Sequence, residues 1–184
     1  VIEYSYIIEE NELSSASEWA HEGIKSAINK GFVPMELQNN YKSVITRAEF
    51  CRMAVKWVEY ATGKSIDYIL EEKGASRNSN AFSDTKDPDI LAAFALGITS
   101  GTGNNSFSPE GQFTREQAAT MVMNACKIIG ANINNPMASG FDDINIASDW
   151  ALNGINFVYS NGIMQGTGNN NFSPKLTYTR EQSI

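Results

Sequence analysis

An internal repeat with a spacing of 65 residues is the strongest constraint on how this chain folds. Residues 97–109 read GITSGTGNNSFSP and residues 162–174 read GIMQGTGNNNFSP, and each segment leads to Thr-Arg-Glu-Gln, at 114–117 and 179–182. A more divergent copy lies upstream, where residues 31–34 read GFVP and residues 46–49 read Thr-Arg-Ala-Glu. Repeated units of this size cannot bury their apolar faces alone, so we expect the three copies to pack together in one bundle.

Each copy carries a signal that starts a helix. Thr46, Thr114 and Thr179 are each followed three residues later by Glu or Gln, which is the spacing of a capping box. After the first two boxes, apolar residues recur at the spacing of a helix with one buried face. These residues are Phe50, Met53, Ala54, Trp57, Val58 and Ala61, and then Ala118, Met121, Val122, Ala125, Ile128 and Ile129. Gly63 and Gly130 are the expected helix ends.

A second helix is expected before each loop. Ser17 and Ser148 are candidate N-caps, and each precedes a Trp-Ala pair and an apolar periodic stretch that ends at Gly31 or Gly162. In the middle copy the helix should open at Pro88, because proline suits the first helical position. The intervening loop is rich in turn-forming residues, and we expect its one phenylalanine to pin it to the core.

The repeat sets the fold class as all-α, a bundle of three helix–loop–helix units, and divides the chain into segments. The expected segments are a lead-in at 1–16, a first repeat at 17–63, an insertion at 64–81, a second repeat at 82–130, a linker at 131–140 and a third repeat at 141–184. The third repeat is interpreted as truncated, because Ile184 follows its capping box by two residues and an isolated turn is unstable. Either the chain was cut there or another copy completes the bundle by self-association.

Composition argues against several classes of protein. The net charge of −7 does not suit a nucleic-acid binder, which needs a basic face. No apolar run approaches the ~20 residues of a membrane span, so no membrane insertion is expected. Cys51 and Cys126 lie in apolar helical patterns and are interpreted as buried thiols, with a disulfide between them left open.

Catalysis has little support in the sequence. His21 is the only histidine, and neither cysteine carries the local signature of a nucleophile. We therefore expect no enzyme, no metal site built on His and Cys, and no cofactor. A calcium-dependent cohesion module is an alternative in which the Asn-rich loops are ligands, but those loops lack the alternating carboxylates that calcium sites need.

The ordered motifs resemble those of the S-layer homology (SLH) family. They are Phe-x-Asp at 82–84 and 141–143, Trp-Ala at 19–20 and 150–151, the Gly-rich turns and the Thr-Arg boxes, and they cover nearly all of 17–184 apart from the insertion. The resemblance implies a bundle of three SLH repeats with pseudo-three-fold symmetry. It also implies a non-catalytic, extracellular module that holds a surface protein of a Gram-positive bacterium to anionic, often pyruvylated, secondary cell-wall polysaccharide.

The resemblance further implies binding grooves between neighbouring repeats. It assigns to those grooves the arginines of the boxes, two tryptophans, two aspartates and four loop residues. These are Arg47, Arg115, Arg180, Trp19, Trp150, Asp84, Asp143, Gly101, Thr102, Gly166 and Thr167. The groove at Arg180 depends on the helix that the truncated third repeat only begins.

The residue chemistry alone leaves these roles open. An arginine in the first helical turn lies near the positive end of the helix dipole, which suggests that it is held for an anion such as a carboxylate. The alternative is a structural bond to a carbonyl or carboxylate of the next repeat. The tryptophans could stack on a sugar or fill the core, and the aspartates could bond hydroxyl groups or stabilise a turn. For the whole chain, the competing hypothesis is a structural module that assembles proteins without binding glycan.

Overall fold

The computed structural model of the protein describes residues 13–184, so most of the predicted lead-in lies outside the described part of the chain. The described residues form helices joined by loops, with isolated bridges in place of extended strands, which confirms the all-α fold class. The α-helices are α1 (His21–Asn29), α2 (Arg47–Thr62), α3 (Ile66–Glu72), α4 (Pro88–Ala95), α5 (Arg115–Ile128), α6 (Leu152–Ser160) and α7 (Arg180–Ser183). The 3-10 helices are η2 (Glu18–Ala20), η3 (Met35–Leu37), η4 (Ile144–Ile146) and η5 (Asp149–Ala151).

Helices α2, α5 and α7 begin at the three predicted capping boxes. The Thr46 N–H donates to Glu49 Oε2 at 2.9 Å, and the Glu49 N–H donates to Thr46 Oγ1 at 3.2 Å. At the second and third boxes the threonine N–H likewise donates to the glutamine side chain, at 3.1 Å in both. Helix α2 ends at Gly63, whose φ of 66° is the left-handed conformation that glycine adopts easily. These helix ends are therefore set locally by the sequence.

The first helices of the outer copies begin differently from the prediction. Ser17 and Ser148 are the N-cap residues of the 3-10 turns η2 and η5, which precede α1 and α6, but neither hydroxyl accepts a capping hydrogen bond. Each serine instead donates its N–H and its Oγ–H to one carboxylate of a neighbouring copy. Ser17 bonds Glu181 at 2.7 and 3.0 Å, and Ser148 bonds Glu116 at 2.9 and 3.1 Å. A charged acceptor makes the stronger bond, which explains why the hydroxyls point away from their own helices.

The three copies close into a ring through the segments that lead into α2, α5 and α7. The Ile45 N–H donates to the Tyr178 carbonyl at 2.9 Å, and the Tyr178 N–H donates to the Phe113 carbonyl at 2.8 Å. All three side chains are buried, and Phe50 packs on Phe113 with ring centroids 4.4 Å apart. Equivalent segments of three copies thus meet at the centre, as expected for a pseudo-three-fold bundle.

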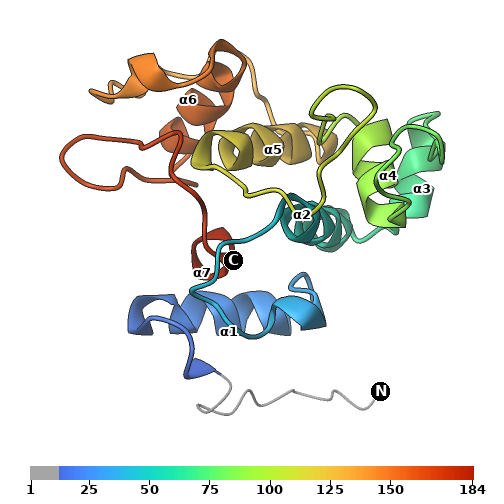
Figure 1. Ribbon diagram of the computed structural model, residues 1–184, viewed down its shortest axis with the longest axis horizontal. Coiled ribbons are helices and arrows are strands. Elements are labelled where there is room, and N and C mark those ends of the chain that lie inside the picture. Colours follow the sequence, from blue (N-terminus) through green and yellow to red (C-terminus); the bar gives the residue numbers. More distant parts are fainter. Residues whose placement is uncertain (1–12) are drawn as a thin grey trace.

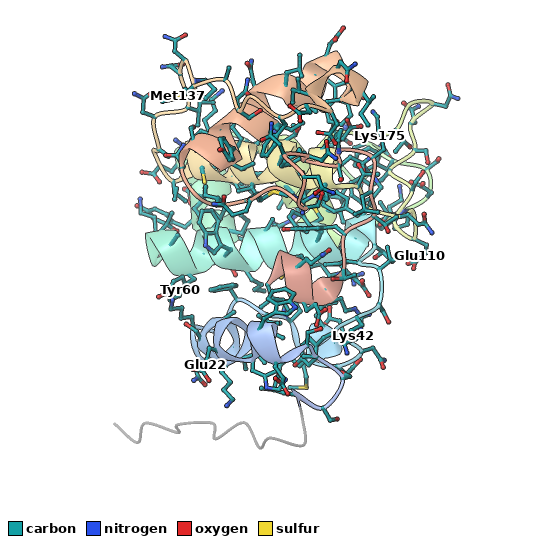
Figure 2. The ribbon with its side chains drawn as sticks, turned by 90° about the vertical axis from the view of Figure 1, so that its left-hand side faces the viewer. Glu22, Lys42, Tyr60, Glu110, Met137 and Lys175 are labelled. Atoms are coloured by element: carbon teal, nitrogen blue, oxygen red, sulfur yellow. The ribbon has the colours of Figure 1, made fainter. Side chains whose placement is uncertain are left out.

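The helices surround this centre in an order that the ribbon makes plain. Figure 1 shows α5 beside α6 at one end of the molecule and α1 at the other, with α2 between them and α3 and α4 together at one side. In Figure 2, the labelled residues Lys42, Glu110 and Lys175 come from the three interhelical loops and lie along the same side of the molecule. Each interhelical loop therefore presents one of these residues on the same side of the molecule.

The segment predicted as an insertion contains helix α3. Ser65 caps this helix by accepting a hydrogen bond from the Tyr68 N–H at 3.2 Å, and Ile66, Ile69 and Leu70 are buried. Helix α3 packs against α2 and α4, so the segment extends the core instead of looping away from it. The division of the chain into repeats, insertion and linker stays a prediction. Among residues 13–184, no helix combines the length and the apolar character that crossing a bilayer requires.

Candidate ligand-binding clefts

The Gly-rich loops of the second and third copies form nearly identical hairpins. Asn104 and Asn105 have φ values of 49° and 55°, a left-handed conformation that asparagine tolerates in tight turns. A Cβ on Gly101 would lie 2.8 Å from the Ser106 carbonyl oxygen, so only glycine fits there. Residues 166–171 repeat this geometry, including the 2.8 Å approach at Gly166. Both glycines thus have a structural reason to be present.

Asp84 and Asp143 hold these hairpins in place. The Asp84 carboxylate accepts hydrogen bonds from the N–H groups of Phe107 and Ser108 at 2.9 and 2.8 Å, and from the Ser106 hydroxyl. These bonds lower the pKa of Asp84 from 3.8 to about 2, the hydroxyl contributing most. Asp143 makes the equivalent backbone bonds at 2.8 and 2.7 Å. The geometry therefore favours the turn-stabilising role for both aspartates.

Arg47 reaches from the first copy into the hairpin of the second. Its Nε donates to the carbonyl of Phe107 at 2.9 Å, and its Nη2 donates to the carbonyl of Ser100 at 3.0 Å. The guanidinium carbon lies 4.7 Å from the centroid of the Phe107 ring, close enough for a cation–π contact. Phe107 itself is fully buried, as predicted, so the arginine rests on a fixed support.

Arg115 makes the same contacts between the second and third copies. Its Nε donates to the carbonyl of Phe172 at 2.8 Å, its Nη2 donates to the carbonyl of Gln165 at 2.6 Å, and its guanidinium lies 4.7 Å from the Phe172 ring. Burial lowers the pKa values of both Arg47 and Arg115, since each guanidinium is largely desolvated. Both arginines therefore have the structural role that the sequence left open, because each binds carbonyls of the next repeat.

Neither arginine forms an ion pair within residues 13–184, although the carboxylates of Asp84 and Asp143 favour the charged forms of Arg47 and Arg115 from a greater distance. Their hydrogen bonds go to neutral carbonyls, and within the described residues no carboxylate lies at ion-pair distance from either guanidinium. An unpaired charge that is taken out of water costs free energy. An anion that bound beside either arginine would recover part of that cost.

The backbone N–H groups beside Arg47 are not free to join such a site. The N–H of Arg47 donates to the Gly111 carbonyl at 3.1 Å, and the N–H of Ala48 donates to the Pro109 carbonyl at 3.0 Å. The start of α5 is closed in the same way by the carbonyls at 174 and 176. The first N–H groups of α2 and α5 are therefore not available to bind an anion.

A cavity of about 480 Å³ opens between the copies at Arg47. It brings together four predicted site residues: Arg47, Gly101, Thr102 and Trp150. The remaining wall comes from residues 97–100 and from one face of α5, where Gln117, Thr120, Met121 and Asn124 lie. Trp150 is 56% exposed, and Trp19, its counterpart in the first copy, is 67% exposed, so the core alternative for the tryptophans is wrong.

Sequence reasoning missed the wall that α5 contributes. Gln117, Thr120 and Asn124 follow the helical spacing of three and four from the capping box, so they form a polar stripe on an otherwise apolar helix. That stripe was a readable signal. Sequence reasoning also missed Glu116, whose buried carboxylate accepts hydrogen bonds from Ser148 and from Lys175 Nζ, the latter at 2.6 Å.

The repeated motifs match a known family of domains. The sequence model of the S-layer homology domain matches residues 82–119 and 140–182, which span the hairpins, the aspartates and two of the Thr-Arg boxes. The chain belongs to the S-layer homology domain family. SLH domains are non-catalytic anchoring modules, and this membership places the chain at the cell surface, in association with the cell wall.

Several relatives carry a similar segment within much longer chains. The exoglucanase XynX of Acetivibrio thermocellus is 30% identical over 173 residues, which cover 90% of this chain and 15% of the relative. The surface-layer 125 kDa protein of Lysinibacillus sphaericus is 25% identical over 177 residues, covering 93% and 14%. The S-layer protein sap of Bacillus anthracis is 26% identical over 170 residues, covering 91% and 19%. The SLH chain thus spans less than a fifth of each of these relatives.

Arg180, the arginine of the third capping box, has different partners from Arg47 and Arg115. Arg180 Nη1 donates to the Asn39 carbonyl at 3.0 Å, and Arg180 Nη2 pairs with the Glu49 carboxylate. Among residues 13–184, its buried Nε finds no hydrogen-bond partner. The first copy lacks the Gly-rich hairpin, so the carbonyl that holds Nε in the other two clefts has no counterpart here. Arg180 therefore lies in an interface between copies, but without the frame that surrounds Arg47 and Arg115.

A second, apolar cavity of about 240 Å³ lies between α2 and α5 and is bordered by α7. Met53 and Trp57 of α2, Ala125 and Cys126 of α5, and Ile184 contribute to its wall. Cys51 and Cys126 are both buried free thiols, as the sequence predicted. In residues 13–184, no group of three or more His, Cys, Asp and Glu side chains is arranged to hold a metal ion.

Proposed function

We propose that this SLH chain anchors its host protein by binding an anionic, pyruvylated secondary cell-wall polysaccharide in the cleft at Arg47. The observation that carries the proposal is the unpaired guanidinium of Arg47, only 8% exposed, at the edge of a cavity that also contains an exposed tryptophan. A pyruvyl ketal carries a carboxylate, which a guanidinium binds through charge-assisted hydrogen bonds. The same sugar ring has an apolar face that can stack on an indole.

The interface at Arg115, between the second and third copies, is the second candidate for the same chemistry. Arg115 donates to carbonyls of the third copy that are equivalent to the partners of Arg47 in the second copy. The hydrogen bond from Ser17 to Glu181 also brings Trp19 near α7, as the bond from Ser148 to Glu116 brings Trp150 near α5. Thr167 takes the place of Thr102, with its hydroxyl 2.7 Å from Ser173 Oγ. We expect this cleft to bind the same class of anionic sugar, and we expect no catalytic activity from these residues.

A co-sedimentation experiment tests the proposal. The chain should sediment with purified, protein-free cell walls and lose most of that affinity when the pyruvyl groups are removed by mild acid. Trp150→Ala should weaken binding about 3- to 10-fold, because loss of one stacking contact costs about 1 kcal/mol. Tyr68→Ala, which removes an aromatic residue of 54% exposure on α3, is the matched control and should bind normally. Equal binding to walls with and without pyruvyl groups would contradict the proposal.

The apolar cavity favours a second candidate function, in which copies of this chain self-associate to assemble surface proteins. Its wall is formed almost entirely by apolar side chains of α2, α5 and the end of α7, which is the kind of surface that a partner helix covers. Light scattering after size exclusion should then report a dimer, and Trp57→Glu should return it to a monomer. A monomer at all accessible concentrations would remove this candidate.

A further inference from the structure

The three box arginines face three equivalent residues, and one of these differs in charge. In each copy the capping box ends in Glu or Gln at the third helical position, and in two of the interfaces this residue is seen near the arginine of the preceding copy. Gln117 lines the same cavity as Arg47, while Glu49 pairs directly with Arg180. By the symmetry of the repeat, Gln182 is the equivalent residue for the interface at Arg115. Two clefts thus have a neutral amide where the third has a carboxylate.

The carboxylate of Glu49 is fully engaged. One oxygen accepts the N–H of Thr46 in the capping box, at 2.9 Å, and the other pairs with Arg180 Nη2. The side chains of Glu49 and Arg180 are only 15% and 14% exposed, so water and salt screen their attraction weakly. The positive charge of Arg180 is therefore already neutralised by the protein.

The neighbouring position in the same cleft is neutralised as well. Arg52 lies one turn beyond Glu49 on α2, at the position that Thr120 occupies in the wall of the Arg47 cavity. Its Nε donates to Asp87 at 2.7 Å, and its Nη1 lies 3.7 Å from Glu36. In addition, the helix that the middle copy contributes, α4, carries no tryptophan. Arg180 and Arg52 are therefore both paired with carboxylates of the protein, and α4 offers no counterpart of Trp150.

We propose that Glu49 is an internal counter-ion that closes the Arg180 cleft to anionic sugars, and that the Glu or Gln at this capping-box position decides which clefts bind. The inference rests on the proposed function and identifies the specificity-determining residues within it. A glutamine keeps the helix cap, because its amide oxygen accepts the same threonine N–H, yet leaves the arginine charge available. A glutamate keeps the cap and competes with the ligand for the arginine.

Exchanging the two residue types tests the inference. The probe is a methyl hexopyranoside carrying a 4,6-linked pyruvyl ketal, titrated into the chain by calorimetry. Gln117→Glu should weaken binding of this probe at the Arg47 cleft about tenfold or more, because the new carboxylate pairs with Arg47. Glu49→Gln should leave binding at the Arg47 cleft unchanged, because Glu49 lies in a different interface. It should also make the Nε–H signal of Arg180 respond to the probe in nuclear magnetic resonance spectra.

Gln112→Glu is the matched control, since it adds the same charge at an exposed position outside the cleft. It should change affinity less than about twofold, and thermal melting should show that all three variants stay folded. If the unsubstituted chain binds the probe and Gln117→Glu binds equally well, the inference is overturned and the proposed function stands. If the unsubstituted chain does not bind the probe at all, both are overturned.

Discussion

Arg47 and Arg115 combine a structural role with a charge that the protein leaves unpaired. Their carbonyl bonds fix the hairpin of the next copy, and the aromatic ring beneath each guanidinium fixes its orientation. This arrangement keeps the positive charge in a defined position at low conformational cost, which favours binding of a planar anion. It also means that removing an arginine affects the fold and the cleft together.

Arg47→Ala should therefore destabilise the chain by about 2–3 kcal/mol, because two carbonyls lose a charged donor and the Phe107 ring loses its cover. Urea unfolding measures this loss. Trp150→Ala, which removes an exposed side chain from the same cleft, should change stability by less than about 0.5 kcal/mol. A stable Arg47→Ala variant would mean that the carbonyl bonds contribute little.

Asp84 gives the hairpin a dependence on pH. Its pKa in the folded chain, about 2, lies below the ordinary 3.8, so the ionised carboxylate stabilises the hairpin above about pH 4, and this contribution is lost as the pH falls through 2. Hydrogen exchange at the N–H groups of Phe107 and Ser108 should accelerate over that range relative to the core. In the Asp84→Asn variant, these two N–H groups should exchange rapidly at both ends of this pH range. If the variant instead kept the pH profile of the unsubstituted chain, the role assigned to Asp84 would be wrong.

At the scale of the elements, the predictions that succeeded were local ones. The capping boxes predicted the starts of α2, α5 and α7, because a threonine and a Glu or Gln three residues apart complete the box within one turn. The 3-10 turns before α1 and α6 were missed, since the serines that precede them bond carboxylates far away in the sequence. The exposure of Trp150 was equally out of reach, because helical spacing fits a core face and a cleft wall equally well.

The hairpin itself should be intolerant of one added methyl group. Gly101→Ala would place a Cβ 2.8 Å from the Ser106 carbonyl and 3.0 Å from the Phe82 ring, so we expect a loss of about 1–3 kcal/mol and a distorted cleft. Gly23→Ala is the control, because nothing lies within 4 Å of that position on α1 and alanine favours a helix. Thermal unfolding should separate the two substitutions, and equal melting temperatures would contradict the packing described.

At the scale of the whole molecule, the closed ring couples the copies. The first N–H groups of α2, α5 and α7 each donate to carbonyls of the next copy, and the bond between Ser17 and Glu181 joins the third copy to the first. No single copy can satisfy these groups alone, so we expect all three to unfold in one transition. Two variants that each keep one tryptophan, Trp57 in the first copy or Trp150 in the third, test this expectation. Their fluorescence should give the same midpoint of urea unfolding. Separate midpoints would indicate independent units.

The assignment of the Arg47 cleft can be tested most directly by titrating the pyruvylated glycoside into the ¹⁵N-labelled chain and following its three indole N–H signals. Trp150 lines the cleft, so its signal should shift as the glycoside is added until the cleft is saturated. Trp57 lines the apolar cavity, so its signal should stay fixed. The methyl ester of the same glycoside, which lacks the negative charge, should leave both signals in place. A shift of Trp57 without Trp150, or equal shifts with acid and ester, would contradict an anionic sugar bound beside Arg47.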